Sequence, residues 1–212
     1  MVYPAEERLL LHRVALESIE SGLQAGVPVA VNPEEFPQTL RCLRASFVTL
    51  KQAAGLRGCI GSLEPRTSLV EDVAHNAFAA AFRDPRFQPL RPGELDTLTV
   101  EVSVLGPKEP LIFSSEQGLI DALRPGIDGL VLQDGVYKGT FLPSVWESLP
   151  QPDEFLQHLK LKAGLPADHW SDTLTVWRYT TEAFSAGIAE IRSDLGWKQH
   201  DEYQKNEHQR QQ

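Results

Sequence analysis

The segment 56–61 reads Leu-Arg-Gly-Cys-Ile-Gly, and it places a guanidinium and a thiol two residues apart between two glycines. If this segment is a strand, Arg57, Cys59 and Gly61 share one face, while the two aliphatic residues point the other way into a core. Gly58 and Gly61 lack Cβ atoms, so a ligand or another backbone can approach the main chain beside the sulfur. A nearby arginine favours the thiolate, which is the reactive form of cysteine. The segment therefore indicates a presented thiol.

A packed thiol is the alternative, because free cysteine is among the most buried residue types and often fills space as a small hydrophobe. Only Cys42 and Cys59 are present, which excludes a disulfide framework and a zinc site built from cysteines alone. In a hairpin through residues 52–55, Cys59 would lie opposite about residue 48. Cys42 would then be roughly 20 Å away, beyond disulfide reach. We expect both thiols to be free in a reducing compartment.

The composition describes a globular protein of 212 residues with a formal net charge of -9. The charge and the absence of a lysine and arginine cluster argue against nucleic-acid binding. The first residues are acidic where a signal peptide is basic, and no apolar run is long enough to span a membrane. These features predict a cytoplasmic protein with no membrane contact.

Periodicity predicts alternating helices and strands. The segment 97–105 alternates most regularly, with Glu101 in the middle of its polar face. A capping box from Ser68 to Glu71 begins a helix that Asp84-Pro85 ends, and Asp134-Gly135 indicates a hairpin turn. The helices are expected at 5–21, 69–83, 115–123 and 152–163. The strands are expected at 43–50, 56–61, 97–105, on both sides of 134–135, and at 173–180, with a polar, disordered tail over 193–212.

Four segments in order resemble the AMMECR domain family, whose bacterial and archaeal members are called protein A of the AmmeMemoRadiSam system. They are the segment 56–61, Ala-Ala-Phe-Arg-Asp-Pro-Arg-Phe at 80–87, Glu-Val-Ser-Val-Leu at 101–105 and Thr-Phe-Leu-Pro at 140–143. The resemblance runs from about residue 8 to 187. It implies an α+β fold over 1–192 in two subdomains: a mostly antiparallel sheet flanked by helices, a smaller second lobe, and a cleft near the cysteine. It implies no established reaction.

The candidate site follows from the residues and from this resemblance. Glu101 could orient Arg57, take a proton or bind a polar ligand, or it could lie on a solvated strand face. Asp84 and Arg86 could contact a ligand or form an ion pair that holds their loop, and Thr140 could rim the cleft or bond to backbone. The candidate catalytic residues are Cys59, Arg57 and Glu101, and the candidate binding residues are Gly58, Gly61, Asp84, Arg86 and Thr140.

No histidine is aimed at Cys59 by periodicity, and no pair has metal-ligand spacing. No nucleotide or iron–sulfur motif is present, so the sequence predicts neither a metal nor a cofactor.

Two functional hypotheses stay open. In the first, the protein is a cysteine-dependent enzyme or substrate-handling component, with Cys59 as nucleophile, carrier or thiolate ligand. The resemblance implies that it acts with a radical S-adenosylmethionine protein and a Memo-like protein. In the second, it is a non-catalytic adaptor that binds a partner segment. The first predicts that Arg57, Cys59 and Glu101 line one cleft, and that iodoacetamide modifies Cys59 before Cys42.

Overall fold

The computed structural model describes residues 2–53 and 55–194. These residues form a mixed α+β fold with two four-stranded sheets in two compact units. The terminal unit contains Val2–Val104 and the segment from Ala183, and the inserted unit is Leu105–Glu182. The α+β expectation is therefore confirmed, and each unit has its own core.

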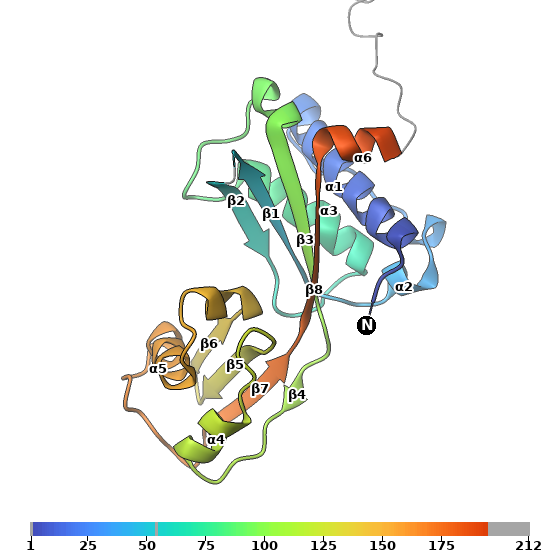
Figure 1. Cartoon of the computed structure of the whole chain (residues 1–212). Coiled ribbons are helices and arrows are strands. Elements are labelled where there is room, and N and C mark those ends of the chain that lie inside the picture. The colour runs from blue at the N-terminus through green and yellow to red at the C-terminus, as the bar shows by residue number, and fades with distance from the viewer. Residues whose placement is uncertain (1, 54, 195–212) are drawn as a thin grey trace, which may run out of the picture. The chain divides into compact units, whose positions relative to one another are not determined.

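The sheet of the terminal unit has the strand order β2-β1-β3-β8 (Figure 1). Its strands are β1 (Ser46–Gln52), β2 (Gly55–Gly61), β3 (Leu98–Leu105) and β8 (Thr181–Gly187). β1 pairs in antiparallel fashion with both β2 and β3. β2 is therefore an edge strand, and its outer row of backbone groups needs partners other than a strand.

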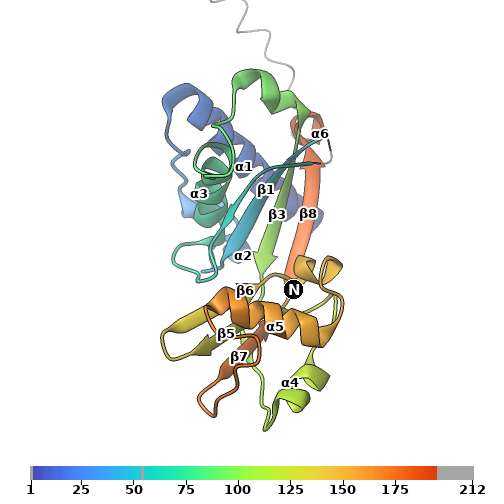
Figure 2. The same cartoon turned by 90° about the vertical axis from the view of Figure 1, so that its left-hand side faces the viewer.

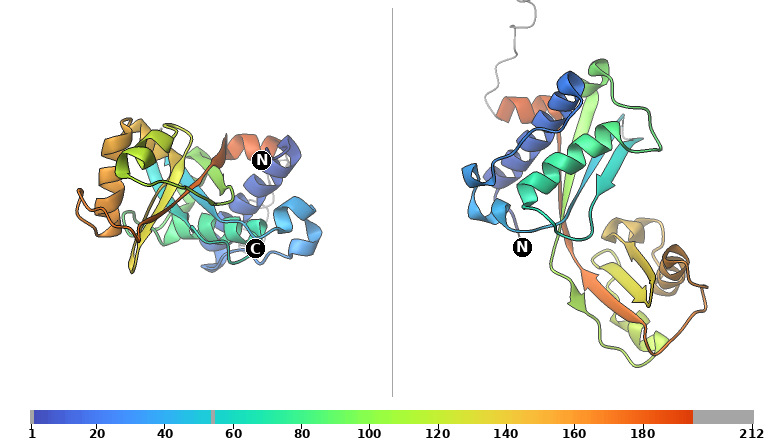
Figure 3. Two further views of the ribbon diagram at one scale, coloured as in Figure 1. Left: turned by 90° about the horizontal axis from the view of Figure 1, so that it is seen from below. Right: turned by 180° about the vertical axis from the view of Figure 1, so that it is seen from behind.

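Two helices cover one face of this sheet, as the view from behind in Figure 3 shows. They are α1 (Ala5–Ala25) and α3 (Leu69–Phe82), and the smaller helical elements are η1 (Pro33–Glu35), α2 (Gln38–Arg41), η2 (Pro92–Thr97) and α6 (Ile188–Asp194). Alternate residues of β1 and β3 pack into the core beneath α1 and α3: Val48, Leu50, Val100 and Val102. The residues between them lie on the opposite, half-buried face: Phe47, Thr49, Lys51, Thr99, Glu101 and Ser103. We call this the open face.

The expected helix ends are right for α3 and wrong for α1. Ser68 and Glu71 form the predicted capping box at the start of α3. The helix α1 continues past Gly22 and ends at Gly26, whose φ of 73° is the left-handed conformation that glycine adopts readily. Gly22 instead provides room for Phe82 of α3, because a Cβ at Gly22 would lie 2.1 Å from that ring. Close packing of the two helices explains this glycine.

The inserted unit has the strand order β4-β7-β5-β6 (Figure 1), and Figure 2 shows the helix α5 (Pro152–Ala163) lying across this sheet. Its elements are β4 (Glu109–Pro110), α4 (Glu116–Ala122), β5 (Gly129–Asp134), β6 (Tyr137–Phe141), η3 (Pro143–Glu147), α5 (Pro152–Ala163) and β7 (Thr175–Tyr179). Gly135 has φ 57° in the predicted hairpin turn, and Gly164 ends α5 as expected. Trp146 stacks on Phe155 in the core, with ring centroids 3.7 Å apart.

Two expectations at the C-terminal end need correction or lie outside the described residues. The strand expected at 173–180 ends at Tyr179, and after Thr180 the chain continues as β8 in the sheet of the terminal unit. The predicted tail begins inside α6, which ends at Asp194. Residues 195–212 lie outside the described part of the chain. Every helix among residues 2–53 and 55–194 is too short or too polar to cross a bilayer.

Candidate functional site

A β-bulge in β2 decides which residues of the segment 56–61 reach the open face. Cys59 lies opposite Thr49 and Gly58 opposite Leu50, but the next pair is Lys51 with Leu56, so Arg57 has no partner across the strand. The extra residue moves Leu56 to the same face as Lys51, and Leu56 is 46% exposed. The expectation that Leu56 points into a core is therefore wrong, whereas Ile60 does pack against it.

The space beside each of the two glycines of this segment is filled by other groups of the same chain. A Cβ at Gly58 would lie 2.1 Å from the carbonyl oxygen of Ala80, so Gly58 lets the backbone of α3 contact the sheet. A Cβ at Gly61 would lie 2.2 Å from the ring of Phe47, its cross-strand partner. The approaching groups are thus a helix backbone and an aromatic ring of the same chain, which favours a packing role for both glycines.

Cys59, Thr49 and Glu101 form one row across three strands. Thr49 is the direct partner of Cys59 on β2 and of Glu101 on β3, so all three side chains lie on the open face. The Thr49 hydroxyl donates to the Cys59 sulfur at 3.2 Å. Two strand spacings separate the Cα atoms of Cys59 and Glu101 by roughly 10 Å. Thr49 is therefore the closest polar neighbour of the thiol in this row.

Glu101 is paired with Lys51 and not with Arg57. The Lys51 ammonium donates to Glu101 Oε2 at 2.8 Å, and both side chains are partly exposed. Arg57 donates to both carboxylate oxygens of Glu94 at 2.8 and 3.2 Å, and also to the carbonyl of Gln88. The expectation that Glu101 orients Arg57 is therefore wrong.

Arg57, at the bulge of β2, forms an ion pair with Glu94 of η2, the element that precedes β3. Its guanidinium, only 13% exposed, holds the pKa of Glu94 below its usual value, with help from the backbone N–H of Arg91. The pairing is bidentate, which fixes the geometry as well as the charge. Its contacts to Glu94 and Gln88 favour a structural role for Arg57.

Asp84 and Arg86 bind the outer edge of β2 at Cys59. The Cys59 N–H donates to Asp84 Oδ2 at 2.9 Å, and Arg86 Nη2 donates to the Cys59 carbonyl at 3.2 Å. Arg86 also donates to both oxygens of Asp84, at 2.9 and 2.7 Å. These side chains replace the missing neighbour strand, so the edge of the sheet is satisfied where the thiol lies.

The electrostatics of this edge are dominated by the same pair. Asp84 is only 4% exposed, and the hydrogen bond from Arg86, followed by the Cys59 N–H, holds the pKa of Asp84 well below its usual value. The pKa of Arg86 is raised chiefly by Asp84, with a smaller contribution from Cys59. Arg86 is thus the guanidinium that contacts Cys59, through the carbonyl of that residue. Of the two roles left open for Asp84 and Arg86, the structure shows the ion pair.

A buried network beside the site was missed by the sequence interpretation. Asp72 of α3 accepts hydrogen bonds from the Ser46 N–H and hydroxyl, from Ser62 and from Asn76, at 2.6–2.9 Å. It joins α3 to the start of β1 and to the residue after β2. The position of Asp72 in the first turn of a capped helix was visible in the sequence, but its partners Ser62 and Ser46 are 10 and 26 residues away and carry no local pattern.

Thr140 lies in the inserted unit, on β6. Its hydroxyl donates to the carbonyl of Leu130 at 2.8 Å and lies 3.3 Å from the Tyr179 hydroxyl. Burial raises the pKa of Tyr179 to about 12. The structure thus shows Thr140 bonded to backbone, and its binding role stays a prediction.

Both cysteines are free thiols; Cys42 is exposed and Cys59 is half-buried. Cys42 donates to the carbonyl of Gln38 at 3.3 Å. The order of their reaction with iodoacetamide stays a prediction, and exposure alone favours Cys42. Within residues 2–53 and 55–194, no cluster of three or more His, Cys, Asp or Glu side chains could hold a metal ion.

Comparison with known proteins gives a consistent family match. A family model described as AMMECR1 matches residues 12–184. A protein of Methanothermobacter thermautotrophicus is 38% identical over 185 residues, which cover 84% of this chain and 94% of that protein. A protein of Thermococcus gammatolerans is 42% identical over 185 residues, covering 82% and 87%. The crystal structure of an uncharacterised protein from Pyrococcus horikoshii matches with a TM-score of 0.75 at 36% identity, covering 85% of this chain and 91% of that one.

Proposed function

This chain belongs to the AMMECR1 family, and we propose that it is a cysteine-dependent enzyme or substrate-handling component in which the Cys59 sulfur binds the substrate or reacts with it. The observation that carries the proposal is the row of Cys59, Thr49 and Glu101 on the open face. The hydroxyl of Thr49 donates to the Cys59 sulfur, so the thiol has a polar contact on this face. The Arg86 guanidinium adds positive charge beside it.

The backbone at Cys59 is held in place before any substrate arrives. Asp84 fixes its N–H and Arg86 fixes its carbonyl, so the position of the sulfur varies only through its own side-chain rotation. A reactive group on a rigid element needs little reorganisation on binding. The Lys51–Glu101 pair on the same face offers both charges to the polar end of a substrate.

The proposed partners are a radical S-adenosylmethionine protein and a Memo-like protein, and the proposed compartment is the reducing cytoplasm. The family resemblance supports the partners, and the two free thiols are compatible with the compartment. In this proposal, the partners carry the cofactor chemistry and this chain presents the substrate on Cys59.

Thiol alkylation tests the proposal. Because Cys42 is exposed, the experiment uses the full chain with Cys42→Ser, and mass spectrometry follows modification of Cys59 by iodoacetamide at several pH values. We expect Cys59 to react in the folded protein. Loss of the Thr49 hydroxyl in Thr49→Val removes one hydrogen bond and should slow the reaction about fivefold.

Thr99→Val is the matched control. Thr99 lies on the same open face, in β3, but its direct partner is Lys51. It should leave the rate unchanged. If Cys59 reacts only after denaturation, or if both threonine variants behave alike, the thiol is a packing group, and the adaptor hypothesis replaces the enzyme.

A further inference from the structure

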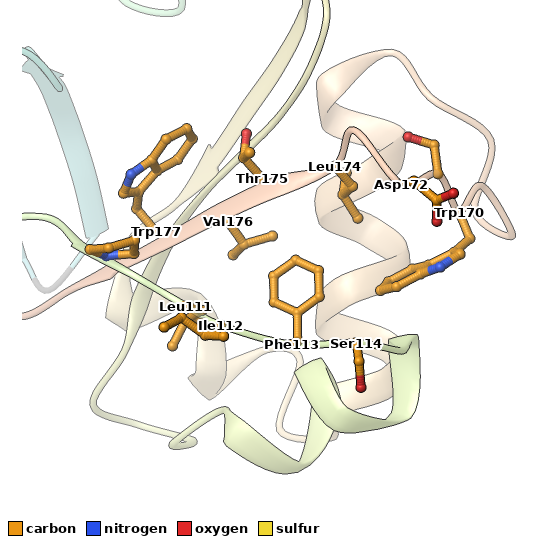
Figure 4. A pocket seen from close by; sticks show the side chains of 12 residues that line it. Leu111, Ile112, Phe113, Ser114, Trp170, Asp172, Leu174, Thr175, Val176 and Trp177 are labelled. Atoms are coloured by element: carbon orange, nitrogen blue, oxygen red, sulfur yellow. The ribbon is translucent and has the colours of Figure 1, made fainter.

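The inserted unit contains a pocket of about 370 Å³ between the segment 110–114 and the start of β7. Three aromatic side chains line it, and Figure 4 shows the Phe113 ring between Val176 and the Trp170 indole, with Trp177 farther along the wall. The ring centroids of Phe113 and Trp170 are 5.7 Å apart. The volume falls within the range of about 300–1,000 Å³ that is typical of sites for small molecules.

The lining of the pocket carries negative charge and no positive charge among the described residues. Asp172 is the one charged residue among the described residues that line it. Ser171 and Thr175 use their hydroxyls within the protein, as donors to Asp134 and to the carbonyl of Gln133. Within the described part of the chain, Asp172 has no hydrogen-bond or ion-pair partner, so its carboxylate is available to a ligand.

The segment 169–173, which contains Asp172, is held in place by hydrogen bonds on the side that faces away from the pocket. Asp134, at the end of β5, accepts hydrogen bonds of 2.6–2.7 Å from three alternate residues of the segment: His169, Ser171 and Thr173. The residues between them, Trp170 and Asp172, line the pocket, and Figure 4 shows Asp172 beside the indole of Trp170. An anchored wall loses little conformational entropy when a ligand binds.

We propose that this pocket binds a small organic cation with an apolar body, of the arylalkylammonium class. The faces of aromatic rings attract cations, most strongly that of tryptophan, and a neighbouring carboxylate adds to the attraction. The ammonium group lies beside Trp170 and Asp172, and the hydrocarbon part packs against Phe113 and Val176. An anionic ligand would meet the unpaired Asp172 with no basic residue in the lining to offset it. This site is independent of the chemistry proposed for Cys59.

Benzyltrimethylammonium is the probe for the test, with benzyl alcohol and benzenesulfonate as neutral and anionic compounds of similar aromatic size. The full chain is titrated with each, affinity is measured by calorimetry, and the indole N–H signals are followed by NMR. We expect saturable binding of the cation, with shifts in the signals of Trp170 and Trp177 and none in that of the core residue Trp146. The neutral compound should bind more weakly, and the anion should not bind.

Substitutions separate the charge from the aromatic wall. Asp172→Asn should weaken binding of the cation about two- to fivefold, as expected for a partly exposed ion pair. Trp170→Leu should weaken it about tenfold. Asp168→Asn is the matched control, because Asp168 is exposed in the same segment and does not line the pocket. Melting curves show whether each variant is folded.

Three outcomes would overturn the proposal. They are equal affinity for the cation and for benzyl alcohol, equal effects of Asp172→Asn and Asp168→Asn, and shifts confined to residues outside the pocket. Each result would mean that the carboxylate and the aromatic wall do not act together on a cation.

Discussion

Gly58→Ala should destabilise the terminal unit, because the new methyl group has no room. Its carbon would lie 2.1 Å from the carbonyl oxygen of Ala80 and 3.0 Å from the carbonyl carbon. Restoring an ordinary contact requires α3 and β2 to separate by about 1.3 Å, and overpacking of this kind typically costs about 1–3 kcal/mol. Both groups are backbone, so neither can turn aside, and we expect a loss near the upper limit, about 3 kcal/mol. The melting temperature should fall by about 10 °C.

The assay is urea and thermal unfolding of Gly58→Ala beside a matched glycine variant. Gly93→Ala is the control, because nothing lies within 4 Å of a Cβ at that position. It should change the free energy of unfolding by less than about 0.5 kcal/mol. Equal stability of the two variants would refute the contact with Ala80 and would return Gly58 to the ligand-contact role that the sequence first suggested.

Three further predictions concern single side chains. The pKa of Asp84 is lower in the folded state than its usual value of 3.8. The carboxylate therefore stabilises the fold above about pH 4, and this contribution is lost as the pH falls further. The urea midpoint of the wild type should decline below about pH 4, and Asp84→Asn should make that decline less steep. A decline of the same steepness in both proteins would contradict this. Cys59→Ala removes one weak hydrogen bond and should cost less than about 1 kcal/mol in urea unfolding, whereas a larger loss would identify a packing role. Lys160 is fully buried and donates to Glu116 at 2.5 Å. Lys160→Met should lower the free energy of unfolding by less than about 1 kcal/mol, and Lys160→Ala by about 2–4 kcal/mol. A larger loss for methionine than for alanine would be inconsistent with a packing role for the aliphatic part of this side chain.

Local patterns predicted the elements well where one physical rule dominates. The alternation of 97–105 gave β3, the serine and glutamate of the capping box gave the start of α3, and Asp134-Gly135 gave the β5–β6 turn. Each rule acts within a few residues. Gly22 shows the limit, because the same residue type that stops a helix also permits a close helix–helix contact, and only the position of Phe82 distinguishes the two.

The site was predicted less completely, because its contacts join distant segments. The hairpin through 52–55 was expected to place Cys59 opposite about residue 48, and its actual partner is Thr49. A shift of one residue moves a partner to the other face of a strand, so Thr49 was missed. The bulge at Arg57 has no local signal beyond the glycine that follows it. The partner of Glu101 depended on the position of Lys51, which strand register alone determines.

Packing and ion pairing account for the glycines and the arginine of the segment 56–61, but they do not account for the Cys59 thiol. Gly58 admits the backbone of Ala80, Gly61 admits Phe47, and Arg57 holds Glu94. Asp84 and Arg86 form hydrogen bonds with the backbone N–H and carbonyl of Cys59. The half-buried sulfur accepts one hydrogen bond, from the Thr49 hydroxyl, so we expect its replacement by alanine to cost little stability. If Cys59→Ala leaves the stability of the fold nearly unchanged, as predicted above, the glycines and ion pairs around this residue would surround a side chain that the fold does not need, which would support the chemical role proposed for Cys59.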